Sequence, residues 1–94
     1  MNEAEFELAD LLALPRDRFK GGEEFLKAAL EAARDAKFEV VQRRDPETRD
    51  LLIIEVWHGA RQLDVRELAS DEEASTMTLL ALIAAIRKHR RLSP

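Results

Sequence analysis

The sequence predicts an α+β fold, in which a three-stranded antiparallel sheet packs against helices in the order α-α-β-β-β-α. Three patterns indicate this fold. Apolar residues recur at helical spacing before residue 37, alternate with polar residues from 38 to 66, and form an unbroken run at 79–86. A chain of 94 residues is typical of a single domain, 1–94. We divide it into an N-terminal helix with its connector (1–20) and an α-β-β-β-α core (21–92).

Two helices are expected before the strands. The first spans Glu3–Leu14 and should end at Pro15, because the residue before a proline is disfavoured in helical conformation. A polar connector that closes with Gly21 and Gly22 leads into the second helix, Glu23–Ala36. The apolar side of this second helix is rich in alanine, which would let another backbone approach closely.

The middle of the chain is expected to form three strands. These are Phe38–Arg43, Leu51–Trp57 and Gln62–Arg66, separated by turns at 44–50 and 58–60. In the third strand, the alternation places Leu63 and Val65 on the same side.

The last helix is expected to run from Ser70 to Arg91. Ser70 and Glu73 have the spacing of a capping box, in which each side chain bonds the backbone N–H of the other residue. The bulky residues of the apolar run cover one side of this helix, which we expect to face the sheet. Small residues gather on the other side, which we expect to receive a second helix, either Glu23–Ala36 or one from another chain: Ala74, Ala81, Ala84 and Ala85.

Composition excludes several classes of protein. The chain has no cysteine, so disulfides and thiolate metal sites are excluded. Its net charge of −4 disfavours a general nucleic-acid binder, because such proteins are usually basic. The acidic N-terminus is unlike a targeting peptide, and no apolar segment approaches the roughly 20 residues that span a bilayer. We therefore expect a cytoplasmic protein without a membrane role.

No motif for catalysis or cofactor binding is recognisable. His58 and His89 are not in a metal-ligand spacing, and no nucleophile elbow is present. Gly21-Gly22 opens a helix, but nucleotide-binding patterns are absent and the adjacent Glu23-Glu24 would repel an anion. Glu55, which interrupts an apolar strand, is expected to face solvent or pair with an arginine. The prediction is a non-enzymatic protein without metal or cofactor.

Three sets of residues are candidates for partner binding. Val41, Ile53 and Trp57 would lie on the sheet face away from the core, where either the N-terminal helix or a partner covers them. The alanines Ala81, Ala84 and Ala85 would admit a second helix. The basic residues Arg87, Arg90 and Arg91 either complement the negative end of the helix dipole or contact an acidic partner.

From Glu23 onward, the order and lengths of the elements resemble the double-stranded RNA-binding domain. That family begins its last helix with lysines that contact RNA. The matching positions here are Asp71, Glu72 and Glu73, which would repel phosphate, so no binding residue is carried over.

The leading hypothesis is a small acidic protein–protein interaction or regulatory module that binds or blocks a partner protein and forms a homodimer. A first alternative is an acidic inhibitor of a nucleic-acid-handling complex, an anti-CRISPR-like mimic of nucleic acid, based on the acidic stretches 1–24 and 67–73. A second alternative is a nucleic-acid binder that uses the basic helix end together with Arg43, Arg44 and Arg49.

Overall fold

The expected α+β fold and its element order are confirmed. The computed structural model describes residues 1–93, and its three strands form one antiparallel sheet in the order β1-β2-β3. The elements are α1 (Glu3–Leu11), a 3-10 turn η1 (Arg16–Arg18), α2 (Gly22–Asp35), β1 (Phe38–Arg44), β2 (Leu52–His58), β3 (Arg61–Leu68), a second 3-10 turn η2 (Asp71–Glu73) and α3 (Ala74–Leu92).

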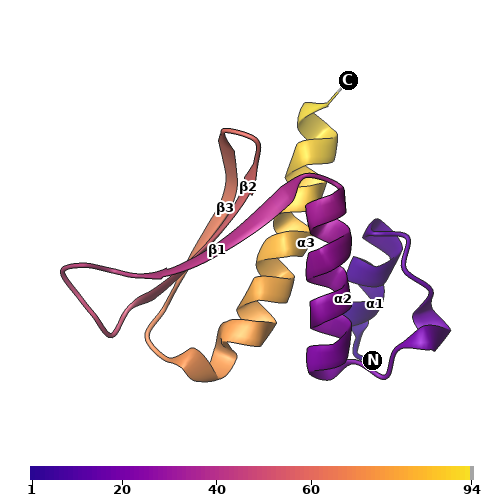
Figure 1. Cartoon of the computed structure of the whole chain (residues 1–94), viewed down its shortest axis with the longest axis horizontal. Coiled ribbons are helices and arrows are strands. Elements are labelled where there is room, and N and C mark those ends of the chain that lie inside the picture. The colour runs from indigo at the N-terminus through magenta and orange to yellow at the C-terminus, as the bar shows by residue number, and fades with distance from the viewer. Residues whose placement is uncertain (94) are drawn as a thin grey trace.

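Helix α3 is the central element of the fold. Figure 1 shows it between the sheet and the other two helices, and it contacts β2 and β3 on one side and α1 on the other. Its apolar run is almost entirely buried, with Leu82 completely inaccessible to solvent. Because both sides of the run are covered within the chain, α3 has its two packing partners without a second copy. The main helical partner is α1 and not α2.

The two sides of α3 are the reverse of the expectation. Thr78 accepts a hydrogen bond from Gln42 of β1, and the His89 ring stacks on His58 of β2, so both residues face the sheet. Helical spacing places Ala81 and Ala85 on the same stripe, and both are fully buried. The small residues therefore let the helix lie close to the sheet.

The bulky side of α3 faces the other helices. Leu79 shares a cavity with residues of α1 and α2, and Arg90 Nη2 donates a hydrogen bond to the Leu11 carbonyl at the end of α1. Arg87 forms an ion pair with Glu7 of α1. The large side chains fill the wider space between helices, where no close backbone approach is needed.

Helix α1 ends earlier than expected, and not because of Pro15. Leu14 N–H bonds the Ala9 carbonyl at 2.8 Å, and Ala13 N–H bonds the Asp10 carbonyl at 3.2 Å. The backbone of Ala13, the residue before Leu14, lies in the left-handed region, with φ of 57°. This is a Schellman closure, which ends a helix through its own backbone hydrogen bonds.

The start of α3 also differs from the expectation. The capping box between Ser70 and Glu73 is not formed; instead, Ser70 Oγ accepts a hydrogen bond from Glu72 N–H. This bond caps η2, and α3 begins only at Ala74. A 3-10 turn brings an earlier amide within reach of the serine hydroxyl, which removes the geometry of a capping box.

A capping box does occur at α1. Asn2 Oδ1 accepts from Glu5 N–H, and Glu5 Oε1 accepts from Asn2 N–H. The second oxygen of Glu5 accepts from Gly22 N–H at 2.8 Å, at the first turn of α2. One carboxylate therefore caps two helices. A Cβ at Gly21 would lie 2.9 Å from this carboxylate, and its φ of 107° also favours glycine.

The buried double cap should be a main source of stability. Replacing it by Glu5→Ala leaves amides unpaired at two helix starts, and we expect a loss of about 1–3 kcal/mol in the free energy of unfolding, measured by urea denaturation. The control is Glu3→Ala in the same turn, which should cost less than about 1 kcal/mol because Glu3 is exposed. Equal losses in both variants would contradict this role of Glu5.

Lys37 joins α2 to β1 in the left-handed region, with φ of 74°. Because glycine adopts this region without strain, Lys37→Gly should raise the free energy of unfolding by about 0.5–1 kcal/mol. The same substitution at the exposed Lys27, inside α2, should lower it by a similar amount. Thermal unfolding of both variants checks the opposite signs, and destabilisation by Lys37→Gly would contradict the argument.

Candidate interaction surface

Within residues 1–93, one face of the sheet has no helix packed on it. The helices contact the opposite face and the β1 side, while α1 packs on α3 and does not fold back over the strands. The expectation that the N-terminal helix might cover Val41, Ile53 and Trp57 is therefore wrong. We call the uncovered surface the outer face.

Strand register arranges the outer face as three rows of three residues. The middle row is Val41–Glu55–Val65, in the order β1, β2, β3. The rows on either side are Glu39–Trp57–Gln62 and Arg43–Ile53–Glu67. Four apolar side chains thus surround a central carboxylate, and charged residues occupy three of the four corners.

Val65 belongs to this surface, which the alternation of the sequence did not predict. The β2–β3 pairing has an irregularity between Val56 and Trp57. At this point β3 has one residue more than β2, so the alternation of its side chains between the two sheet faces shifts by one residue. As a result, Leu63 is only 4% exposed and joins the core, whereas Val65 is 49% exposed. The alternation of apolar and polar residues in β3 does not predict this bulge, because a bulge depends on the pairing with the neighbouring strand.

Glu55 at the centre of the outer face is held by its neighbours, as expected for a carboxylate that pairs with an arginine. Its Oε1 accepts from the Trp57 indole N–H at 3.0 Å, and its Oε2 accepts from Arg43 Nε at 3.1 Å. The residue is only 8% exposed. The Trp57 hydrogen bond, together with the charge and hydrogen bond of Arg43, lowers the pKa of Glu55 against the opposing effect of burial.

The alanines proposed for partner binding do not form a surface. Ala81 and Ala85 are fully buried against the chain's own sheet, and Ala84 is half-buried. A partner helix therefore has no access to the first two residues in this conformation.

The basic helix end is partly engaged within the chain. Arg87 pairs with Glu7, and Arg90 bonds the α1 terminus, whereas Arg91 is exposed. Of the further arginines proposed for nucleic acid, Arg43 pairs with Glu55 and Arg44 with Asp71, whereas Arg49 is exposed. These contacts reduce the number of cations available to phosphate.

The acidic stretches are also partly neutralised. Glu5 is buried as a double cap, Glu7 pairs with Arg87, Asp10 with Arg16, and Asp71 with Arg44. A mimic of nucleic acid would need free carboxylates on one face, so these contacts weaken the support for that alternative.

The two histidines are brought together with Phe38. The rings of His58 and His89 stack with centroids 4.0 Å apart, and each makes an edge contact with the phenyl ring. Across residues 1–93, no group of three or more histidines and acids has the arrangement of a metal site. In the same part of the chain, none of the helices has the length and apolar character needed to span a bilayer.

Comparisons of the chain with family models, with curated proteins and with solved structures found no match.

The contacts of Glu55 predict a pH-dependent stability. Because its pKa is lower in the folded chain than the ordinary value of 4.5, Glu55 stabilises the fold above that pH, and the contribution is lost as the pH falls through the lowered pKa. Glu55→Gln should therefore destabilise the fold more at about pH 7 than at about pH 3. Urea denaturation at the two pH values measures the difference. Glu39→Gln, at an exposed position on the same face, is the control for the loss of a carboxylate, and an equal pH effect in both variants would contradict the role of these contacts.

Proposed function

We propose that this chain is a non-enzymatic protein–protein interaction module and that its outer face is the interface. The observation that carries the proposal is the apolar group of Val41, Ile53, Trp57 and Val65, against which no helix packs within residues 1–93. Val65 is 49% exposed and Val41 and Trp57 are half-buried, whereas Ile53, between its neighbours, is only 6% exposed. Contiguous apolar surface of this kind on a small protein marks an interaction site.

The centre of the outer face is suited to burial in an interface. A free carboxylate there would oppose docking, because removing an unpaired charge from water is costly. The hydrogen bonds from Trp57 and Arg43 to Glu55 already replace part of its hydration. Tryptophan and arginine are also the residues most enriched at the energetic centres of protein interfaces.

A second copy of the chain is the partner that the surface fits best. If two outer faces meet about a two-fold axis parallel to β2, each β1 residue lies opposite the β3 residue of the same row. Val41 then meets Val65, and Arg43 meets Glu67. The two copies thus place Val41 on Val65 and opposite charges together at two corners. Each Glu55 lies opposite the Glu55 of the second copy, and its charge is offset by Arg43 of its own chain. Such self-complementarity is what a two-fold dimer requires.

The size of the face limits the strength of the association. Three strands of seven or eight residues cover roughly 10–15 Å by 24 Å, which is small beside the roughly 800 Å² that each partner buries in a standard interface. We therefore expect a concentration-dependent dimer with a Kd of about 1 μM or weaker. In a cell, such a module would act by reversible binding.

Substitution of Val65 tests the interface. Val65→Glu places a charge among apolar side chains, and we expect the dimer Kd to rise by about tenfold or more in sedimentation equilibrium. Leu92→Glu is a matched control, because Leu92 is 50% exposed, much as Val65 is, but lies at the end of α3. It should leave the Kd unchanged.

Charge reversal tests the two-fold arrangement itself. Glu67→Arg should weaken the dimer by placing like charges together, and the further change Arg43→Glu should restore it. A chain that stays monomeric at about 1 mM, a concentration at which even weak specific dimers form, would overturn the proposal. So would association that Val65→Glu leaves unaltered.

A further inference from the structure

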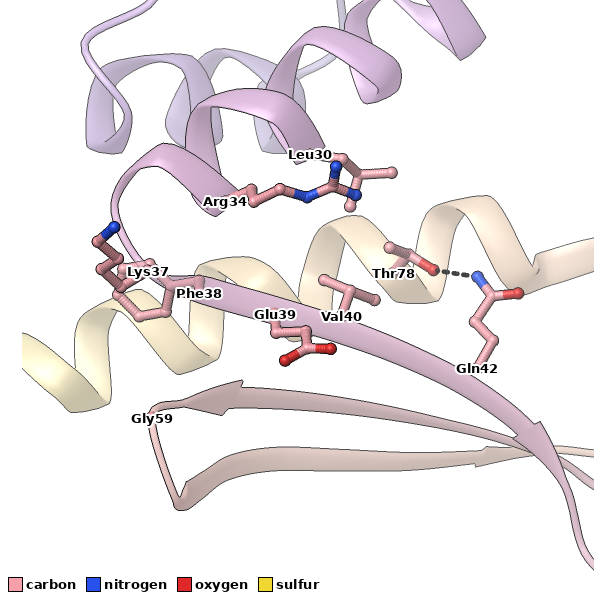
Figure 2. A pocket seen from close by; sticks show the side chains of 9 residues that line it. All are labelled: Leu30, Arg34, Lys37, Phe38, Glu39, Val40, Gln42, Gly59 and Thr78. Atoms are coloured by element: carbon pink, nitrogen blue, oxygen red, sulfur yellow. Dashed lines mark hydrogen bonds between the residues drawn. The ribbon is translucent and has the colours of Figure 1, made fainter.

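A groove separates α2 from β1, on the side of the sheet away from the outer face. Its volume is about 790 Å³, and its walls include Leu30 and Arg34 of α2, Phe38, Val40 and Gln42 of β1, and Thr78 of α3. In Figure 2 the β1 ribbon runs along this groove with α2 above it. A second depression continues along α2 and shares Leu30 and Arg34 with it.

In the part of the chain that the structure describes, the edge of β1 that borders this groove has no partner strand. β1 pairs only with β2, because the sheet order is β1-β2-β3. Asp45 N–H bonds the Leu51 carbonyl, and the alternation of an antiparallel ladder then gives the pairing of every other residue. By that alternation, the N–H and C=O groups of Phe38, Val40 and Gln42 point away from β2. These same residues line the groove.

The two edges of the sheet differ in how they are protected. β3 carries an ion pair between Asp64 and Arg66 and an irregularity in its pairing, two devices that discourage a further strand from adding. The first half of β1 has neither device, and two of its residues, Phe38 and Val40, contact the apolar core. A further strand would therefore pair with the edge of β1 and not with the edge of β3.

The charges at the groove indicate the character of its occupant. Arg34, Lys37 and Glu39 border it. Strand alternation turns the Glu39 side chain toward the outer face, in the row of Trp57. Neither cation forms an ion pair with any other residue in 1–93. Figure 2 shows the Arg34 side chain extending along the groove on the Leu30 side, above Val40. A carboxylate on a bound segment would pair with this guanidinium while neighbouring apolar side chains contact Leu30 and Val40.

We propose that this groove binds an extended, acidic segment of a partner protein, which adds to β1 as a fourth antiparallel strand. Strand addition at an edge is a general mode of peptide recognition, in which backbone hydrogen bonds give affinity and pockets for alternate side chains give specificity. A second copy of β1 fits less well, because it would bring its own Arg34 and Lys37, and Arg44 at the end of the strand, toward the same cations. The site is separate from the outer face and does not depend on it.

The test is selection of a phage-displayed library of random heptapeptides on the purified full chain. Enriched peptides should alternate apolar residues with at least one Asp or Glu. A synthetic copy of the best peptide should shift the NMR amide signals of Phe38, Val40 and Gln42. Shifts confined to Trp57 and Val65 would overturn the groove and support the outer face instead, so the two proposals fail separately.

Charge reversal gives the matched comparison. Arg34→Glu should weaken binding of the selected peptide by about tenfold or more, and a new selection on this variant should enrich Lys or Arg. Arg49→Glu, in the exposed β1–β2 connection, should leave the affinity unchanged. If Arg34→Glu unfolds, Arg34→Gln carries the same expectation with a smaller loss. No enrichment over a blank surface, or equal effects at Arg34 and Arg49, would refute the proposal.

Discussion

The burial of α3 on two sides is the constraint on which the rest of the structure depends. A helix with eight consecutive apolar residues cannot leave either flank in water without a large loss of hydrophobic stabilisation. The sheet covers the flank that carries Ala81 and Ala85, and α1 covers the flank that Arg87 and Arg90 border. The positions of the other elements follow from these two requirements. The Glu5 carboxylate then joins the starts of α1 and α2.

The same constraint explains why the outer face is bare. The described residues form three α-helices: α3 lies on the inner side of the sheet, α1 packs against α3, and α2 lies beside β1. None is left to cover Val41, Ile53, Trp57 and Val65. The position of α2 in turn leaves a groove over the unpaired edge of β1. The two proposed surfaces are thus consequences of one packing arrangement, although they differ in chemistry. The outer face is apolar around a neutralised carboxylate, and the groove is bordered by unpaired cations.

Part of the charge that stands out in the sequence serves the fold. The acidic start of the chain supplies the cap at Glu5 and the ion pair of Glu7, and the basic end of the chain supplies Arg87 and Arg90 as ties to α1. The charge runs are the feature that suggested nucleic acid, but Glu5, Glu7, Arg87 and Arg90 have their partners within the chain. Arg34 is less conspicuous, since its helix face is predicted to be solvated, yet it borders a groove, as Lys37 does, and neither forms an ion pair in 1–93.

The sequence by itself determined the class of fold, the type and order of the elements, and the membership of Val41, Ile53 and Trp57 in the sheet face away from the core. These follow from the spacing of apolar residues, which is a local property. Only the tertiary structure decided three other matters: which side of α3 meets the sheet, which way Val65 points, and which helix covers α3. Each depends on a contact between segments far apart in the chain. The sequence of a helix does not show which neighbouring element will pack against its side of small residues. The sequence of a strand does not show a bulge that arises from its pairing with another strand.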